Sequence, residues 1–392
     1  MTGRNLLVVQ GGGPTQVLNA TLAAIVEEAH AQGKFKQLYG AKKGIHGLLN
    51  GGVADLGKLT ASDLALLRVS PGAALGSSRA KPSEEDLARL LGYLQSNNIH
   101  DLLFLGGNGT MRGAERVSRF CAERGFGVQV VGVPKTVDND IVMTDRCPGY
   151  ASAARYIAQS TRDLGTDVRS LPQPVSILET MGRSVGWLAA AAAAGKLDEY
   201  DAPHLVYLPE RAFRMDEFLI DLDRVVTAQG WAIVIVAEGI RDVQGRYVYQ
   251  VEDPTQSDPL SRPITGGVAQ FVAEAVARNL KIRCRSEKPG LLGRTSMLHA
   301  SDQDRKDAEL VGHAAVRGLL AGETEKMVSL LPLNAPSETD CAFVPLEMVA
   351  EKARPIPREW IGDGAIPVKA KFFEYLRPLM GELASYCTAL HQ

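Results

Sequence analysis

The feature that most constrains this chain is a junction that occurs twice: a short apolar run, a glycine-rich turn and the pattern of an amphipathic helix. The run at 6–9 ("LLVV") leads into "QGGGPTQ", and the run at 102–105 ("LLFL") leads into "GGNGT". After each turn, apolar residues recur three and four positions apart, which is typical of a helix with one buried face. Strands that alternate with helices in this way predict parallel sheets with helices on both faces.

The same alternation continues along the chain. Apolar runs at 128–133, 175–178, 205–208 and 232–236 predict further strands. Helical patterns follow residue 17, residue 110 and the "MGR" motif, and another lies around 215–229; Gly33 is predicted to end the first. The segment 252–267 is rich in Pro, Ser and Gly and predicts a loop or a mobile segment. The chain has 392 residues, enough for two domains, so we predict an α/β fold of two three-layer α/β/α domains with mainly parallel sheets.

Composition excludes several classes of function. The formal net charge is −2, whereas a protein that binds nucleic acid without sequence preference needs a basic face. The five cysteines lie far apart without a CxxC pair, which argues against a disulfide framework or a zinc site and favours the reducing cytosol. The apolar run "WLAAAAAAG" is too short to span a bilayer. We therefore expect a cytoplasmic protein with a small-molecule substrate, no nucleic-acid partner and no membrane partner.

The two glycine-rich turns predict sites for anions. A strand, a bare turn and a helix start together present backbone N–H groups and the positive end of a helix dipole, an arrangement that suits phosphate. Neither "GGGPT" (11–15) nor "GGNGT" (106–110) matches the Walker motif or the dinucleotide-binding motif. The alternative is that each is only a tight turn that needs a positive φ. Two such turns at strand ends favour phosphate binding.

The motif "PKTVDND" (134–140) adds side chains that can take part in chemistry. Lys135 is a compact cation, and Asp138 and Asp140 stand two residues apart. On an extended segment such residues point the same way, and two aligned carboxylates suit a general base beside a magnesium ligand. The alternative is a solvated turn with an Asx motif.

The motif "ETMGRSVGWLA" (179–189) follows another predicted strand. Arg183 is placed to clamp a phosphate or a developing negative charge. The same stretch matches the nucleophile elbow G-x-S-x-G, which would make Ser184 a nucleophile with His299 as its base. That hydrolase hypothesis would leave both phosphate-type turns without a role, so we favour Ser184 as a residue at a helix start.

Two later segments add candidate ligands for a sugar phosphate. Glu238 in "VIVAEGI" ends a predicted strand, where its carboxylate can accept a sugar hydroxyl; the alternative is a surface glutamate. Arg285 and Arg294 flank a Pro-Gly turn in "RCRSEKPGLLGR" and can bind a phosphate, although a cationic stripe is more often a solvated face.

These motifs together resemble the phosphofructokinase family from about residue 5 to residue 330. The resemblance rests on seven ordered motifs: "GGGPTQVLNA", "LGSSR", "GGNGT", "PKTVDND", "MGR", "AEG" and "GLLGR…D…A". It is strongest to the bacterial branch that is usually assigned pyrophosphate as donor. The family implies 6-phosphofructokinase activity, the Mg²⁺-dependent transfer of a phosphoryl group to the 1-hydroxyl of fructose 6-phosphate.

The resemblance also implies roles for individual residues. Asp138 matches the base, beside Thr136, with Lys135 and Arg183 completing the catalytic group. The donor site matches Gly12, Arg79, Gly107, Asn108, Gly109 and Thr110. The sugar-phosphate site matches Thr136, Asp138, Met181, Gly182, Arg183, Glu238, Arg285 and Arg294. Mg²⁺ is expected at Asn108 and Asp140.

Domain organisation follows from the resemblance too. We expect a donor domain at 1–148, rejoined by part of 292–345, a sugar-phosphate domain at 149–291, an active site in the cleft between them and an extension at 346–392. In the family some sugar-phosphate arginines come from a neighbouring subunit. Arg285 is the candidate here, which implies a homodimer or homotetramer with shared active sites.

The sequence departs from the family on the donor side. Asn108 stands where relatives commonly carry an acid linked to the metal, and a neutral amide should bind metal more weakly. Pyrophosphate enzymes typically carry Asp at the position of Gly109; its absence admits ATP, so we predict ATP as the donor. Lys135 and the whole-chain likeness favour the alternative, pyrophosphate.

The acceptor side departs as well. Pro174 lies where many relatives have an arginine, Leu291 replaces a usual His or Tyr, and Gly293 replaces a usual Gln. Losing one charge-assisted contact costs about 1.5–3 kcal/mol. Two alternatives therefore stay open: a kinase for another sugar phosphate, such as sedoheptulose 7-phosphate, or a catalytically silent paralogue that binds sugar phosphates.

Overall fold

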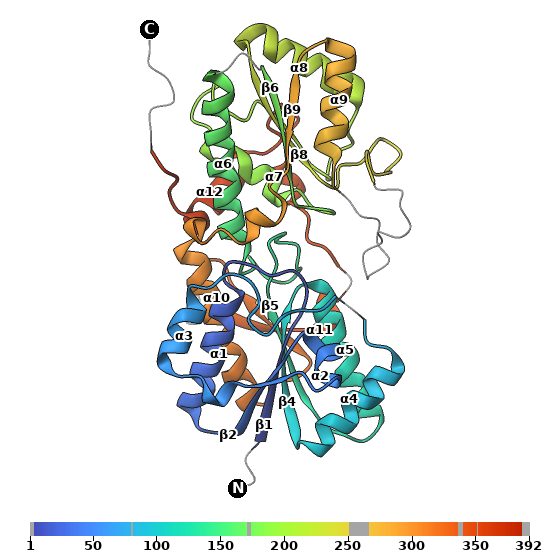
Figure 1. Cartoon of the computed structure of the whole chain (residues 1–392), viewed down its shortest axis with the longest axis vertical. Coiled ribbons are helices and arrows are strands. Elements are labelled where there is room, and N and C mark those ends of the chain that lie inside the picture. Colours follow the sequence, from blue (N-terminus) through green and yellow to red (C-terminus); the bar gives the residue numbers. More distant parts are fainter. Residues whose placement is uncertain are drawn as a thin grey trace. The chain divides into compact units, whose positions relative to one another are not determined.

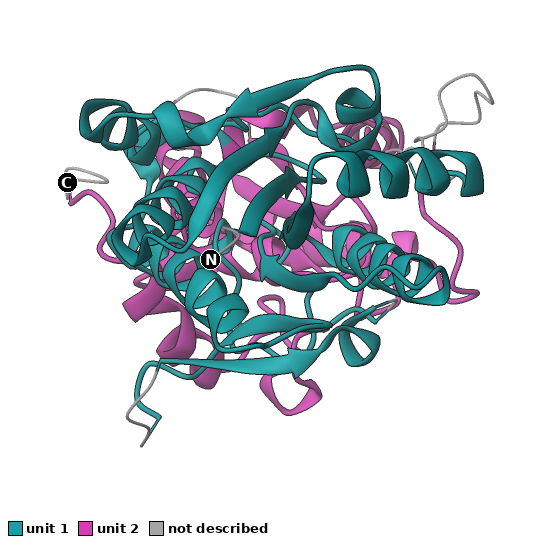
Figure 2. Cartoon of the chain, turned by 90° about the horizontal axis from the view of Figure 1, so that it is seen from below, with its two compact units in different colours: residues 1–150, 295–354 teal, residues 151–294, 355–392 magenta. Residues whose placement is uncertain are grey.

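A computed structural model of the chain describes residues 4–79, 81–170, 174–250, 266–335, 340–350 and 352–385. It divides into two compact units, each built from two separate stretches of sequence. Unit 1 comprises Met1–Tyr150 and Thr295–Arg354, and unit 2 comprises Ala151–Arg294 and Pro355–Gln392 (Figure 2). The stretch from residue 346, which the sequence suggested as a separate extension, is shared: its first part belongs to unit 1 and its later part to unit 2.

The described part of unit 1 contains a seven-stranded sheet in the order β11-β10-β5-β4-β1-β2-β3. Its strands are β1 (Arg4–Gln10), β2 (Phe35–Ala41), β3 (Val53–Asp55), β4 (Ile99–Gly106), β5 (Gln129–Pro134), β10 (Lys326–Leu330) and β11 (Cys341–Pro345). The pairs are parallel except at the two edges, where β3 and β11 are antiparallel to their neighbours. The parallel strands β1, β4 and β5 therefore end at the same edge of the sheet.

Helices cover both faces of this sheet (Figure 1). One face carries α1 (Leu18–Gln32), α3 (Ala61–Arg68) and α10 (Asp302–Leu320). The other carries α2 (Gly44–Leu49), α4 (Glu84–Ser96), α5 (Asn108–Glu123) and α11 (Leu346–Val349). Side chains of the central strands alternate between the two cores: Leu6 and Val8 pack on the first face, Leu7 and Val9 on the second. Burial on both faces explains why these strands read as unbroken apolar runs.

Unit 2 is a smaller layered unit with a parallel sheet in the order β7-β8-β6-β9. Its strands are β6 (Val175–Thr180), β7 (Leu205–Tyr207), β8 (Ala232–Ala237) and β9 (Cys284–Glu287). Its helices are α6 (Tyr150–Ser170), α7 (Trp187–Ala191), α8 (Met215–Gln229), α9 (Val268–Leu280) and α12 (Ala370–Met380). Trp187 is fully buried beside Phe372, with their ring centroids 5.9 Å apart, so α7 and the late helix α12 share one core.

The predicted α/β fold is confirmed, and the six strands expected from apolar runs are β1, β4, β5, β6, β7 and β8. Gly33 ends α1 in the left-handed region, as predicted, with φ 59°. The helical pattern after "MGR" is α7, which continues as the 3-10 turn Ala192–Gly195. Most of the expected loop at 252–267 lies outside the described residues. Among the described residues, every helix is too short or too polar to cross a bilayer.

One charged cluster joins the first helix of unit 1 to its last long helix. Glu28 on α1 is 5% exposed, and its carboxylate accepts two hydrogen bonds of 2.9 Å from the Arg317 guanidinium on α10. His313 Nδ1 lies 3.0 Å from the same carboxylate. The Arg317 hydrogen bond is the main reason that the pKa of Glu28 falls from 4.5 to about 2.

We expect Glu28→Gln to destabilise the protein by about 1–2 kcal/mol at pH 7, because the variant loses a charge-assisted contact. The folded-state pKa lies below the unfolded value, so this contribution is present above about pH 4.5 and is lost as the pH falls toward 2. Thermal unfolding of both proteins between pH 7 and pH 3 measures it. Glu27→Gln, at a neighbouring side chain that is 49% exposed, is the control and should change stability little. An equal destabilisation by Glu28→Gln at both pH values would contradict the assignment.

Candidate functional site

The two glycine-rich turns of unit 1 contact each other directly. The Gly11 amide donates to the Leu105 carbonyl at the end of β4. A Cβ on Gly11 would lie 2.5 Å from Thr110 Oγ1, and a Cβ on Gly106 would lie 2.2 Å from the same oxygen and 2.8 Å from the Gly11 carbonyl. Contacts this short exclude any side chain at either position. The bare turns are therefore required by their mutual packing, in which the Gly11 and Gly12 amides donate to the Leu105 and Ser78 carbonyls.

Lys135 connects the third strand end to the first turn. Its side chain is 3% exposed, and its ammonium donates to the carbonyls of Gly11, at 3.1 Å, and Gly13. Its backbone amide donates to the Gly106 carbonyl, so one residue holds both turns. Gly12 has φ 76°, and a Cβ there would lie 3.3 Å from the Lys135 ammonium. The predicted cation is thus placed inside the phosphate-type loop, where it neutralises carbonyl dipoles.

The other residues of the predicted donor site gather at this strand edge. Helix α5 begins at Asn108, directly after Gly107, and the Thr110 and Met111 amides donate to the Gly107 carbonyl. The Asn108 and Gly109 amides precede these first helical hydrogen bonds. Gly109 is exposed, and a Cβ there would meet nothing within 4 Å. Arg79 is exposed and follows Ser78. Ser78 forms a parallel β-bridge with Gly11, and its carbonyl accepts a hydrogen bond from the Gly12 amide. The structure therefore brings the two turns, the helix start and the "LGSSR" segment together in unit 1.

The prediction that Asp138 and Asp140 share a face of an extended segment is wrong. Asn139 between them has φ 54°, in the left-handed region that Asn tolerates better than most residues, and the chain bends at Val137 and Asp138. Thr136 Oγ1 accepts from the Asp138 amide at 3.1 Å. The segment is therefore a compact loop and not an extended strand, and we call it the carboxylate loop (residues 136–147).

Asp140 lies next to the predicted metal residue Asn108. The Asn108 side-chain amide donates to an Asp140 carboxylate oxygen at 3.0 Å. Burial raises the pKa of Asp140, while hydrogen bonds from Thr136 and Asn108 and the charge of Arg354 oppose that rise. Asn108 Oδ1 is buried and has no hydrogen-bond partner among the described residues. A buried carbonyl oxygen without a partner beside a carboxylate is a donor set that fits Mg²⁺.

These two residues supply only part of a magnesium shell. In the described ranges, no three His, Cys, Asp or Glu side chains gather as a metal site. Mg²⁺ usually keeps several waters and is otherwise bound through one or two carboxylates and the substrate phosphates. The arrangement around Asn108 and Asp140 agrees with that mode of binding.

The predicted sugar-phosphate residues of unit 2 meet where β6 and β8 end. Gly182 has φ 128°, and a Cβ there would lie 2.6 Å from the Val185 carbonyl. A Cβ on Gly239 would lie 1.9 Å from the Arg183 carbonyl, so the "MGR" turn packs on the "AEG" strand end. Burial raises the pKa of Glu238, and the Arg183 charge and a hydrogen bond from the Gly182 amide oppose that rise. Met181, Gly182, Arg183 and Glu238 therefore form one cluster.

Arg285 is not part of that cluster. It pairs with Ser176 near the start of β6, five residues before Met181, which corresponds to about 16 Å along a strand. Pro174 also lies at that end, directly before β6. Arg294 ends the 3-10 turn Gly290–Arg294, which approaches Met181 through Gly293, whose Cβ would lie 3.8 Å from the Met181 methyl. Leu291 in the same turn is 62% exposed.

Two charged residues beside the cluster were missed by sequence reasoning. Glu179 is 3% exposed and accepts from the Gly267 and Ala269 amides at the start of α9. Lys288, directly after β9, reaches the same carboxylate at 3.4 Å. The sequence did offer a signal for Glu179, which stands in a strand that is otherwise suited to burial. A buried carboxylate requires hydrogen-bond donors or a cation beside it.

The rival assignment of Ser184 as a nucleophile gains no support. Ser184 is exposed in the turn before α7. His299 Nδ1 lies 2.8 Å from the Ser296 hydroxyl, so the proposed base has a neighbour of its own three residues away.

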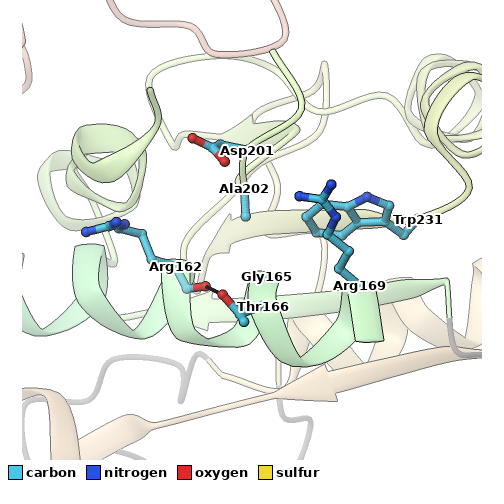
Figure 3. A pocket seen from close by; sticks show the side chains of 7 residues that line it. All are labelled: Arg162, Gly165, Thr166, Arg169, Asp201, Ala202 and Trp231. Atoms are coloured by element: carbon cyan, nitrogen blue, oxygen red, sulfur yellow. Dashed lines mark hydrogen bonds between the residues drawn. The ribbon is translucent and has the colours of Figure 1, made fainter. Parts of the chain in front are cut away.

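A separate surface hollow in unit 2 carries none of the predicted residues. Figure 3 shows Arg162, Thr166 and Arg169 from α6 beside Trp231, which precedes β8. The hollow therefore lies at the N-terminal ends of the unit 2 strands, whereas Met181 to Arg183 follow a C-terminal end.

Comparisons with known proteins agree on one family. The sequence model described as Phosphofructokinase matches residues 5–319. The pyrophosphate–fructose 6-phosphate 1-phosphotransferase of Xanthomonas campestris pv. campestris (strain B100) is 37% identical over 393 residues, covering 97% of this chain and 92% of that protein. The sulfofructose kinase of Alkalicoccus urumqiensis is 34% identical and covers 87% of each chain. The structure of a pyrophosphate-dependent phosphofructokinase from Nitrosospira multiformis has a TM-score of 0.86 and 30% identity, covering 99% of this chain and 95% of that one. The prediction of ATP as the donor is not confirmed, and pyrophosphate is better supported.

The packing of the two turns makes a prediction about stability. We expect Gly106→Ala to lower stability by about 1–3 kcal/mol, because the added methyl group would overlap Thr110 and the Gly11 carbonyl. Gly109→Ala, three residues further along, meets open space at a helix start and should leave stability unchanged or slightly raised. Thermal unfolding of the two variants beside the wild type measures both effects. Equal melting temperatures for the two variants would contradict the packing described here.

Proposed function

Because the chain belongs to the phosphofructokinase family, we propose that it transfers a phosphoryl group from pyrophosphate to the 1-hydroxyl of fructose 6-phosphate, forming fructose 1,6-bisphosphate and orthophosphate. The observation that carries the proposal is the likeness to the Xanthomonas campestris phosphotransferase over nearly the whole of both chains. Phosphoryl transfer needs positioned charge more than covalent catalysis, and both units supply such groups at strand ends.

In this proposal each group has one task. Asp138 takes the proton from the sugar 1-hydroxyl, and that oxygen attacks the terminal phosphorus as the bond to the bridging oxygen breaks. The amides at the start of α5 and the charge of Lys135 hold the donor phosphates. Asn108 and Asp140 would hold Mg²⁺, which supplies positive charge to the phosphoryl oxygens when bound. Met181, Gly182, Arg183 and Glu238 bind the sugar phosphate, with Arg294.

ATP is a second candidate donor, and Gly109 is the observation that favours it. The residue is exposed at the start of α5 and a Cβ there would have nothing within 4 Å, which leaves room for a donor larger than pyrophosphate.

The acceptor is also open to a direct test. The relative from Alkalicoccus urumqiensis is named for sulfofructose, so proteins this similar differ in acceptor. We propose fructose 6-phosphate first, with sedoheptulose 7-phosphate and sulfofructose as the compounds to try next.

We also propose that the protein works in the cytoplasm, in glycolysis, as a homo-oligomer. The position of Arg285 supports the last point. Its strand register places it far from Met181 in its own chain, which suits a residue that serves the site of a neighbouring copy.

A donor comparison tests the proposal. Wild-type protein with Mg²⁺ and fructose 6-phosphate is expected to form the bisphosphate with pyrophosphate. In Gly109→Asp, the added negative charge should reduce any rate with ATP at least about tenfold more than the rate with pyrophosphate. Gly113→Asp, which adds the same charge one helical turn away at another unobstructed position, is the matched control. If neither donor yields product with any of the three acceptors, the proposed function is refuted.

A second prediction concerns the proposed base. Asp138→Asn should lower kcat by about 10²- to 10⁴-fold without changing the melting temperature, because the variant keeps the shape of the side chain but cannot take up the proton. Steady-state rates and thermal unfolding of the variant provide the measurement. Asp302→Asn, at an 86% exposed carboxylate of unit 1, is the control and should keep full activity. Activity of Asp138→Asn within a few-fold of wild type would remove Asp138 from this role.

A further inference from the structure

The segment Ala353–Ile356 carries the chain from unit 1 into unit 2. It also contacts a loop of the candidate site at each of its ends. No motif in the sequence pointed to it, because its contacts are with residues far away in the chain.

The first end of the segment is tied to the carboxylate loop. Ala353 forms an antiparallel bridge with Ile141, and the Arg354 amide donates to the Asp140 carbonyl at 2.8 Å. The Arg354 side chain then donates to three more carbonyls of the same loop: Asn139 at 3.2 Å, Thr144 at 2.7 Å and Asp145. A guanidinium is the side chain whose rigid, planar set of donors can hold several carbonyls at once.

This loop needs such support. Asn139 and Met143 both have positive φ, at 54° and 62°, although neither is glycine. Non-glycine residues stay in that region only where surrounding contacts hold them there. Inside the loop, Asn139 Oδ1 accepts from the Cys147 amide. From outside the loop, Ser329 Oγ donates to the Met143 carbonyl, and Leu330 contacts Thr144 and Asp145. Arg354 adds outside contacts at the Asn139 and Asp140 carbonyls.

The second end of the segment is tied to the turn after "MGR". Ile356 is 1% exposed, and its amide donates to Glu210 Oε1 at 3.3 Å. The same oxygen accepts from the Gly186 amide at 2.9 Å. A Cβ on Gly186 would lie 2.7 Å from Glu210 Oε2, so the carboxylate packs directly against this turn. Glu210 therefore holds the turn that follows Arg183 and the segment that follows Arg354.

We propose that Arg354 and Glu210 are positioning residues of the reaction: Arg354 sets the backbone that carries Asp138 and Asp140, and Glu210 sets the turn that carries Arg183. This inference rests on the proposed function, because it assigns the two loops to proton transfer and sugar-phosphate binding. It predicts that the two residues affect different kinetic constants.

Arg354→Ala is expected to lower kcat about 10- to 100-fold while the KM for fructose 6-phosphate stays within about twofold. Arg354→Lys keeps the charge but not the planar set of donors, so it should recover only part of the loss. Glu210→Ala should raise the KM for fructose 6-phosphate about tenfold with a smaller change in kcat, and Glu210→Gln, whose amide oxygen still accepts, should restore it. The control is Arg68→Ala, which removes ion pairs to Glu27 and Glu309 elsewhere in unit 1.

Hydrogen exchange on the free proteins gives a readout that does not depend on activity. Arg354→Ala should speed amide exchange in residues 139–147 relative to both wild type and Arg68→Ala, and Glu210→Ala should do so in residues 182–187. If kcat and KM change together in both variants in proportion to lost stability, or exchange in these segments is unchanged, the inference is overturned. A wild type without activity on any donor would refute the proposed function, and the exchange data would still decide whether these residues hold the two loops.

Discussion

Close packing around the Thr110 side chain is the constraint on which the rest of unit 1 depends. Gly11 and Gly106 both approach its hydroxyl so closely that neither position has room for a Cβ. The ends of β1 and β4 can meet there only as bare backbone, and helix α5 can begin directly after them. Lys135 then closes the arrangement from the end of β5, with its ammonium on the carbonyls of the first turn. The start of α5 lies at this packed junction, and the positive end of a helix dipole is the feature on which the proposed phosphate site rests.

Each unit has a buried carboxylate close to its strand ends, Asp140 in unit 1 and Glu238 in unit 2. Burial raises the pKa of Asp140 in unit 1 and of Glu238 in unit 2, since a carboxylate loses hydration there. In each case hydrogen bonds and a nearby arginine, Arg354 or Arg183, stabilise the charged form. These contacts limit the rise in pKa that burial causes, but in both groups burial is the larger effect.

The sequence predicted the parts of the fold in which local pattern and burial agree. The central strands β1, β4 and β8 are buried along nearly their whole length, so unbroken apolar runs identified them. Strands β2, β3, β9, β10 and β11 were not predicted. Of these, β10 is buried and was simply missed, whereas β2 and β9 contain exposed polar positions and gain their place by pairing with a buried neighbour. The error at Asp138 and Asp140 has the same origin. An extended segment was assumed, whereas the positive φ of Asn139 is set by contacts to Cys147 and Arg354.

Local spacing was enough to predict which residue types would stand at the strand ends: bare turns, a lysine and carboxylates, in an order that resembles one family. Turns and strand ends depend on the backbone preferences of residues that are adjacent in the sequence, so a short stretch of sequence is enough to predict them. The tertiary structure alone decided how they are held. Glu179 on the start of α9, Glu210 on the turn after Arg183 and Arg354 on the carboxylate loop are all contacts between distant parts of the chain. No local preference encodes such contacts, because they form only when folding brings together segments that are separated by tens to hundreds of residues.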